Sequence, residues 1–473
     1  MTYPSIAARF SCILAALVVC IGLASGPVHA QGQAASSRTI DFDEAVRIAL
    51  DQNTTLKRAT NQVAGREAQV RREYMDFTPN LNLSTSTNRN FGLVRDQQTF
   101  RLVNQTVDQF SVGASTGITL FDGMENFASL QRANLSAQAS DLDLERTRQD
   151  VVFEVMNGYL NYIESQELIR VREEELESRR QQLRQTEEQV DVGSLPVSDL
   201  YQQQAQVAQA EQQLLNAERQ AQLDKTGLIQ TLQLDPFGEY EFEAPTVGEA
   251  DLTEESYELD RLLEQAFQRR TDLQAQQFSL RAAEQNVRAA RSGYFPSLSV
   301  DFGYGSNWSS TLPDQIFDRE GNVIEDDISF FDHLDNQKGG RFGFSINIPV
   351  FNRLQTRTQV RQAQIDLQNE QYNLQDQRQQ VALQVRQAYL DYQNAEKQLE
   401  VADTRLRAAE RAREAAQERY NLGAVPFVEL AQANAEFVSA ASEQVRARYN
   451  FIFQKKLIDY YLGVLNPQGS LFQ

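Results

Sequence analysis

The chain contains one structural unit twice, and this duplication limits the folds that its 473 residues can adopt. The segment around Pro79 matches the segment around Pro296 at an offset of 217 positions. Further along, an offset of 230 holds without a gap and superposes Pro196 on Pro426. The offset grows by 13 positions between Pro296 and Phe351, so the second unit has the longer loop there.

Each unit contains a long segment in which an apolar residue recurs at every seventh position among Gln, Glu and Arg, the spacing typical of a coiled coil. No helix breaker falls within 161–191 or 352–421. Segments with Gly and Pro at 192–200 and 422–430 then stop and reverse the chain. The sequence therefore predicts two helical hairpins, and the limb over 123–192 would be roughly 105 Å long at 1.5 Å per residue. The heptad positions of that limb are Val155, Tyr162, Ile169, Leu176, Leu183 and Val190.

Shorter segments before each hairpin alternate apolar and polar residues with a period of two. They predict strands at about 80–90, 109–120, 297–308 and 341–350. Their length and single apolar face are typical of transmembrane β-strands. The alternative is an antiparallel sheet packed on a soluble core, but the helices use their apolar stripes on each other and leave no core for it. The pattern therefore favours strands that cross a membrane.

The first 30 residues are typical of a secretory signal peptide. Arg9 precedes an apolar run over 12–26, which is shorter than the roughly 20 residues that a membrane-spanning helix needs. Small residues at Val28 and Ala30 suit a signal peptidase, although a lipoprotein signal ending at Cys20 is an alternative. The mature chain is therefore expected to begin at Gln31 without a lipid.

The duplication then divides the chain into five parts. These are a signal peptide (1–30), a first repeat (31–236), a linker or equatorial segment (237–258), a second repeat (259–465) and a C-terminal tail (466–473).

Composition excludes several classes of function. Both cysteines lie in the signal segment, and without it the chain keeps one histidine, His333. This excludes disulfides, thiol catalysis and multi-histidine metal sites, and it argues against a Ser-His-Asp triad. The net charge of −20 argues against a nucleic-acid partner. We therefore expect no catalytic residues, no metal site, no cofactor and no nucleic acid.

The longer loop of the second unit, over 306–340, is strongly acidic. Its carboxylates between Asp318 and Asp335 could hold calcium, but their spacing matches no known metal loop, so a solvated extracellular loop is favoured. His333 is expected to be a surface residue of this loop. Trp308, the single tryptophan, ends a strand where an aromatic belt residue would lie.

Four strands cannot span a bilayer alone, because unpaired strand edges in hydrocarbon cost several kcal/mol per polar group. The sheet must close into a barrel, and three copies of the chain would supply twelve strands. A symmetric ring would also set the helical hairpins side by side as a long tube below the barrel.

The mature chain resembles the TolC-like outer-membrane efflux and secretion channels, also called outer membrane factors. The resemblance rests on the duplication, the openings at 44–50 and 262–267, the proline-led strands and the two hairpin tips. It implies a mainly α fold with a β-barrel portion: a homotrimer with a 12-stranded barrel in outer-membrane lipid, continued by a periplasmic α-helical tunnel. It also implies a passive exit duct for efflux or type I secretion in a Gram-negative-type cell. Such a duct is recruited by a periplasmic adaptor (membrane fusion protein) and an inner-membrane pump of RND, ABC or MFS type.

The resemblance also assigns roles at the hairpin tips. In the family, a tyrosine before the second tip is linked to an acid after the first, and Tyr420 and Asp199 match these gate positions. A second link joins an arginine to a hydroxyl residue; here Ser198 supplies the hydroxyl, but Val425 replaces the arginine. The entrance selectivity ring corresponds to Glu429 and Gln432. The expected adaptor-contact residues are Val192, Gly193, Ser194, Leu195, Pro196, Leu422, Gly423, Ala424, Val425 and Pro426.

Alternatives remain at each level. Tyr420 also falls on the heptad frame as a seam residue, and Glu429 could pair with Arg419 instead of facing a pore. A structural or adhesive trimeric coiled-coil surface protein is the second candidate function, and an enzyme is a distant third. Strand blocks alternate with hairpins twice along the chain, which favours the duct over a fibre. The sequence does not identify the cargo, the pump or the adaptor.

Overall fold

The computed structural model describes residues 38–95, 101–243, 253, 255–311, 315–317, 323–326 and 328–465. The expected signal peptide, the mature start at Gln31 and the tail 466–473 lie outside the described residues. So does much of the acidic loop, including Asp314, Asp318, Glu320 and Asp327, which belong to the carboxylates considered for calcium.

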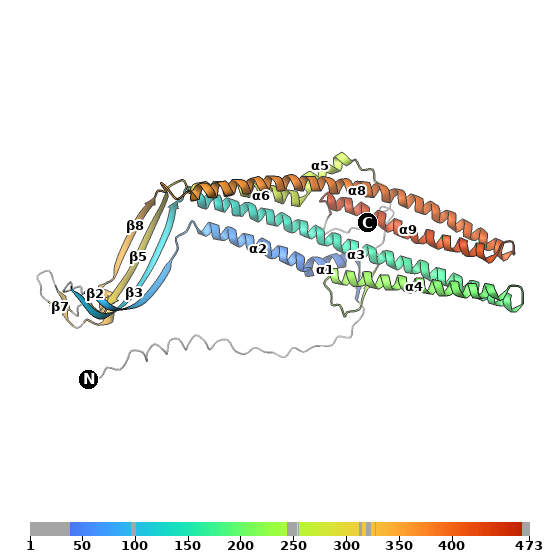
Figure 1. The fold of residues 1–473 in the computed structure, drawn as a ribbon, viewed down its shortest axis with the longest axis horizontal. Coiled ribbons are helices and arrows are strands. Elements are labelled where there is room, and N and C mark those ends of the chain that lie inside the picture. The colour runs from blue at the N-terminus through green and yellow to red at the C-terminus, as the bar shows by residue number, and fades with distance from the viewer. Residues whose placement is uncertain are drawn as a thin grey trace, which may run out of the picture.

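Long helices dominate the molecule (Figure 1), so the expected mainly helical fold with a β portion is confirmed. The first limb of each hairpin has 67 residues and the second limb has 35, so the two repeats of the sequence form helices of equal length. A 67-residue helix is roughly 100 Å long. The hairpin helices are α3 (Glu125–Asp191), α4 (Val197–Thr231), α8 (Gln355–Asn421) and α9 (Phe427–Tyr461).

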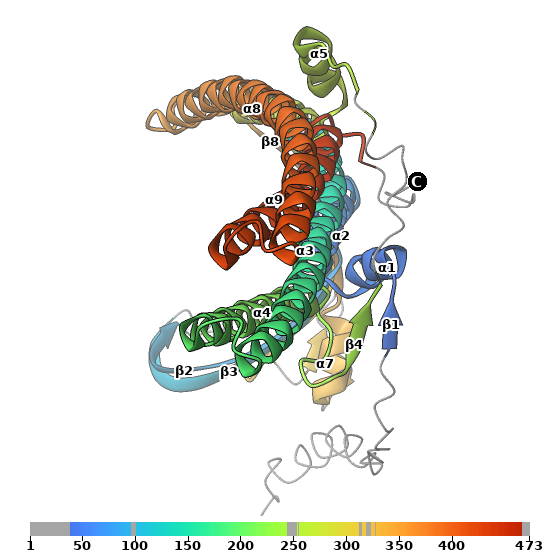
Figure 2. The ribbon, with the colours of Figure 1, turned by 90° about the vertical axis from the view of Figure 1, so that its right-hand side faces the viewer.

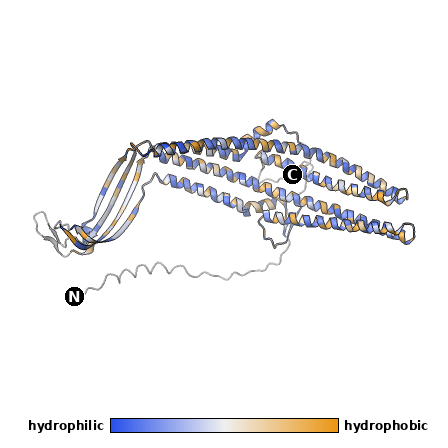
Figure 3. Cartoon of the chain, viewed as in Figure 1, coloured by the Kyte–Doolittle hydropathy of each residue, from blue (hydrophilic) through white to orange (hydrophobic). Residues whose placement is uncertain are grey.

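Two shorter helices complete the helical layer beside the long ones. α2 (Thr54–Met75) packs on α3, and α6 (Thr271–Ser292) packs on both α3 and α8. Seen along its length, the layer is curved, with the long helices following one arc (Figure 2). Polar and apolar residues alternate along all of these helices (Figure 3). Within the described part of the chain, no helix combines the length and the hydropathy needed to cross a membrane.

A four-stranded antiparallel sheet extends from one end of the helical layer (Figure 1). Its order is β2-β3-β5-β8, so the central pair, β3 with β5, joins the two repeats. β3 begins already at Leu102, earlier than the expected 109, because it pairs with β2 along its whole outer half. The strands are β2 (Asn82–Arg95), β3 (Leu102–Phe121), β5 (Ser297–Ser309) and β8 (Gly339–Asn347).

A compact core surrounds the middle of α3, outside the helical layer. There α1 (Phe42–Gln52) and a parallel pair of short strands, β1 (Arg38–Ile40) and β4 (Tyr240–Phe242), cover the helix. Tyr159 of α3 is fully buried among them, and its hydroxyl lies 3.1 Å from the carbonyl oxygen of Ile40 and 2.5 Å from that of Glu243. This tyrosine therefore fastens both short strands to the helix.

The second repeat uses an ion pair for the same purpose. α5 (Leu259–Arg269) packs on α8, and the preceding segment carries Glu255. Lys455 of α9 lies 2.8 Å from Glu255, and Tyr392 of α8 contacts the Glu255 backbone through its hydroxyl. The equatorial segment is thus attached to the hairpins by polar contacts in both repeats.

The acidic loop contains structure that the sequence did not predict: a two-stranded pair, β6 (Gln315–Phe317) with β7 (Val323–Asp326), and a short helix, α7 (Phe330–Asn336). The expectation that His333 is a surface residue is wrong, because its exposed fraction is only 7%. α7 packs on β5 through Phe330, and residues three apart share one helix face, so His333 is turned toward the sheet as well.

Candidate functional site at the hairpin tips

The two hairpin tips have the same backbone geometry, and their sequences explain it. Gly193 and Gly423 have left-handed φ angles of 73° and 68°, which residues with a Cβ rarely adopt. Each helix ends in the same pattern of hydrogen bonds, from Gly193 N to Val190 O and from Ser194 N to Gln189 O in the first tip. The second tip repeats it with the amides of Gly423 and Ala424.

A proline then starts the return helix of each hairpin. Pro196 and Pro426 occupy the N-cap positions of α4 and α9. The third residue after each proline is acidic, Asp199 in one tip and Glu429 in the other, and it lies in the first turn of its helix. A carboxylate at that place is stabilised by the helix dipole, typically by 0.3–1 kcal/mol.

The apolar residues that follow the two long helices are exposed rather than packed. Val192 and Leu422, which cap the two long helices, have exposed fractions of 79% and 83%. Val425, at the position where the family pattern would place an arginine, is instead buried (7% exposed). The tips therefore present uncovered apolar surface at the end of the molecule farthest from the sheet (Figure 1).

Tyr420 lies at the junction of the two hairpins. Its ring packs edge-on against Phe427, with centroids 6.0 Å apart. Burial raises the pKa of Tyr420, a hydrogen bond with Thr186 of the other hairpin opposes the rise, and the charge of Asp199 adds to it. Asp199 is thus close enough to Tyr420 for its charge to act on the phenol, and the hydrogen-bond partner of Tyr420 in this chain is Thr186.

The neighbouring residues that the sequence analysis predicts for the gate and the entrance ring make local contacts. The Ser198 hydroxyl lies 3.2 Å from the Asp199 carboxylate. Glu429 forms an ion pair of 2.7 Å with Arg419, and both side chains are about half exposed. This is the alternative arrangement for Glu429 that the sequence left open. Gln432 is exposed on α9 and faces the groove described below.

Thr186 was not identified from the sequence, because this residue lies between the heptad positions Leu183 and Val190 and not on one of them. Near its tip the first hairpin buries Arg179, Gln182, Thr186 and Gln203, each at most 6% exposed. Gln203 donates from Nε2 to the Arg179 carbonyl at 3.1 Å, and burial lowers the pKa of Arg179. At the equivalent positions of the second hairpin, 230 residues further on, alanines stand in place of Arg179 and Thr186. A buried polar residue between two apolar heptad positions was the available signal.

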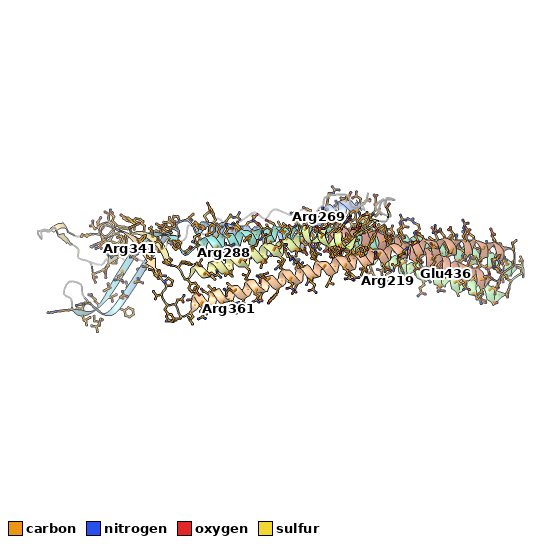
Figure 4. The ribbon with its side chains drawn as sticks, turned by 90° about the horizontal axis from the view of Figure 1, so that it is seen from above. Arg219, Arg269, Arg288, Arg341, Arg361 and Glu436 are labelled. Atoms are coloured by element: carbon orange, nitrogen blue, oxygen red, sulfur yellow. The ribbon has the colours of Figure 1, made fainter. Side chains whose placement is uncertain are left out.

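A polar groove of about 870 Å³ lies between the hairpins and is lined by residues of α3, α4 and α9. The Arg446–Glu164 pair, with 3.9 Å between charged atoms, joins α9 to α3 beside it. The second hairpin is braced internally, because Arg405 pairs with both Glu436 and Glu443 across α8 and α9. Glu436 lies in the half of the layer nearer the tips (Figure 4). The groove is lined by residues that include Arg172, Arg179, Gln206, Gln432, Ser439 and Arg446.

Comparison with known proteins identifies the family. The family model of outer membrane efflux proteins matches residues 45–232 and 262–458, one segment in each repeat. The chain belongs to the outer membrane efflux protein family. Members of this family are channels of the outer membrane, and this protein is an outer-membrane protein whose helical part lies in the periplasm. Family membership disfavours the surface-fibre alternative.

Relatives cover most of this chain at low identity. It is similar to outer membrane protein TolC of Escherichia coli strain K12, at 21% identity over 77% of this chain and 72% of TolC. It is similar to cation efflux system protein CusC of Escherichia coli O157:H7, at 26% identity over 91% of this chain and 88% of CusC. The crystal structure of VceC from Vibrio cholerae shares the fold, with a TM-score of 0.74 at 18% identity over 89% of this chain and 96% of VceC.

Proposed function

We propose that the protein is a passive, trimeric exit duct that a periplasmic adaptor connects to an inner-membrane pump. The observation that carries the proposal is the sheet: within the described part of the chain, its outer strands β2 and β8 each have one edge without a neighbouring strand. In an outer membrane such edges need partner strands, because hydrocarbon offers no other hydrogen-bonding groups. Pairing β8 of one copy with β2 of the next would close twelve strands from three chains.

Mass measurement tests the closure. Light scattering of the detergent-solubilised protein, corrected for bound detergent, is expected to give three chains per particle. A monomeric particle that retains its full strand content would refute the closed barrel.

We assign the adaptor contact to the tips, because exposed apolar side chains mark contact surfaces. The mature chain is expected to contain no cysteine, which favours single-cysteine crosslinking. A cysteine at Val192 or Leu422 is expected to crosslink to the co-expressed adaptor. A cysteine at Leu223, which is exposed higher on α4, is the matched control. Equal crosslinking at the tip and control positions would remove the tips from the interface.

We assign the gate to Tyr420, Asp199 and Ser198, with Thr186 as an additional partner within the protomer. The entrance ring is assigned to Glu429 together with Gln432. The Arg419 pair neutralises part of the Glu429 charge, so we expect only weak cation selectivity at this entrance. Planar-bilayer recordings of Arg419→Gln should show increased cation selectivity, and those of Glu429→Ala should show a decrease. If neither substitution changes selectivity, Glu429 does not face the pore.

The cargo, and whether the partner pump belongs to an efflux or a type I secretion system, are open parts of the proposal. The name of CusC describes cation efflux for that protein, but 26% identity does not carry a cargo to this chain. Purifying the adaptor-linked complex and identifying the inner-membrane protein in it would assign the system.

A further inference from the structure

The short helix α7 lies on the outward face of the sheet. On β5 the side chains of Leu298, Val300, Phe302 and Tyr304 share one face, and Trp308 lies on the same face by the two-residue period. Phe110 of β3 is paired with Trp308 in the register. The Phe330 ring of α7 contacts both, with centroid distances of 5.5 Å to Phe110 and 5.2 Å to Trp308.

This apolar face is the one that meets lipid. The side chains of Phe302, Tyr304, Phe342 and Phe344 are all exposed, and in an outer-membrane protein an uncovered apolar strand face lies against hydrocarbon. The opposite face carries small and polar side chains such as Asp301. In the end-on view α7 lies on the convex side of the helical layer, away from its hollow (Figure 2).

The level of α7 along the strands matches the outer membrane boundary. From Leu298 to Trp308 the strand rises roughly 33 Å, which a tilt of about 40° reduces to the roughly 25 Å of a barrel's apolar band. Beyond Phe110 the same face carries an ion pair, Arg89 with Asp108 at 2.6 Å, so water begins there. The sheet–α7 contact therefore lies where the lipid-facing band ends, on the side away from the periplasmic helices.

α7 is two-sided at this level. Phe330 and His333 face the sheet, and the backbone oxygen of Leu334 accepts a hydrogen bond of 2.5 Å from Ser306 of β5. Phe331 points away and is 77% exposed, and its ring packs edge-on with that of Phe330. Next to it, Asp335 is paired with Lys338 and exposed to water. An exposed aromatic ring beside exposed charges is the composition of a membrane-interface segment.

We infer that α7 is an interfacial anchor, which lies on the outer rim of the barrel and inserts Phe331 into the headgroup–acyl boundary of the outer leaflet. The partner is the lipid surface itself, because α7 is held by Phe330 at the level where the lipid-facing strand face ends, and Phe331 is exposed there. The inference depends on the outer-membrane location and not on trimer closure, the gate or the adaptor.

Fluorescence quenching tests the anchor, because Trp308 is the only tryptophan of the chain. A Trp308→Phe, Phe331→Trp variant places the single indole on α7. Reconstituted in phosphatidylcholine vesicles, it is expected to lose emission when bromine is carried near the headgroup end of the acyl chains. Bromine near the chain terminus should quench it less, and aqueous iodide should quench it weakly.

A matched control places the indole at Phe237, which is 94% exposed in the turn before β4 and lies beside the periplasmic helices. The Trp308→Phe, Phe237→Trp variant should be quenched by iodide and by no bromolipid. If the Phe331→Trp probe behaves like this control, or is quenched by neither agent, α7 does not contact lipid and the inference is wrong. The wild-type Trp308 provides the independent check, since its quenching by bromolipid reports barrel insertion alone.

Discussion

Replacing Tyr420 with phenylalanine tests whether the contact between the two hairpin tips holds the entrance shut. The substitution removes one hydroxyl and keeps the ring that packs on Phe427. The lost hydrogen bond is the one to Thr186, a side chain that is 3% exposed and that also donates to the Gln182 carbonyl at 2.9 Å. Thr186 therefore keeps one partner, and the local fold should survive.

The size of the effect identifies the partner of Tyr420 in the closed state. A hydrogen bond between two neutral hydroxyls contributes about 1 kcal/mol, so in the proposed trimer three protomers opening together would lose about 3 kcal/mol. Because 1.4 kcal/mol is a factor of ten, the ratio of open to closed channels would rise roughly 100-fold. A bond to the charged Asp199 is worth about 1.5–3 kcal/mol per protomer, which would raise the ratio by more than 1,000-fold.

Open probability in planar bilayers measures this ratio directly. Tyr201→Phe is the matched control, because Tyr201 lies near the same tips and is 65% exposed. Combining Tyr420→Phe with Thr186→Val and, separately, with Asp199→Asn shows which partner is coupled to the tyrosine. If Tyr420→Phe leaves the open probability of the channel at the Tyr201→Phe value, the hydroxyl does not keep the entrance closed. Tyr420 is then only a packing residue of the coiled-coil interface.

Other substitutions test the equatorial core and its charges. Tyr159→Phe removes the buried hydroxyl that contacts the carbonyl oxygens of Ile40 and Glu243, although the Ile40 oxygen keeps the Glu243 amide as a donor; it should lower the free energy of unfolding by about 1–3 kcal/mol in chemical denaturation. Burial raises the pKa of Asp459, so the stability that this side chain contributes is present at acid pH and is lost as the pH rises through its pKa. Asp459→Asn should therefore raise Tm at neutral pH and leave Tm unchanged at about pH 3. Asp272 is the opposite case, because despite its burial the Arg270 guanidinium holds its pKa below the usual value. Asp272→Asn should therefore lower Tm at neutral pH, and the loss should shrink as the pH falls through the pKa of Asp272. Tm shifts of the same sign for the two aspartates would contradict the assigned pKa directions.

The repeated elements could be predicted from sequence because periodicity survives without knowledge of neighbours. The seven-residue period predicted both hairpins. The Gly and Pro residues predicted the positions of the tips, where Gly193 and Gly423 reverse the chain. The period of two gave the four strands. What periodicity does not contain is the pairing of β3 with β5, since that contact joins segments from different repeats.

Single side chains were predicted less well, because their environment is supplied by distant segments. His333 was expected at the surface since its loop is acidic, but α7 folds back on β5 and buries it. For Glu429 the sequence left two arrangements open, a pore-facing ring and a pair with Arg419, and the pair forms where the turn brings the two helix ends together. Thr186 is distinguished in the sequence only as a polar residue between two apolar heptad positions, and its contact with Tyr420 requires the two hairpins to be packed side by side.

The β3–β5 pairing also determines the order in which the chain can fold. Gln109 meets Ser309, so 200 positions of chain, including the whole first hairpin, must be synthesised and exported before this contact can form. Until then β2 and β3 form a lone two-stranded ribbon with an apolar face, which is marginally stable in water and prone to aggregate. Closing so long a loop is slow compared with forming the local coiled coils. The helical hairpins should therefore fold first in the periplasm. The sheet should be completed last, when β5 and β8 of the second repeat pair with β3 at the end of the helical layer.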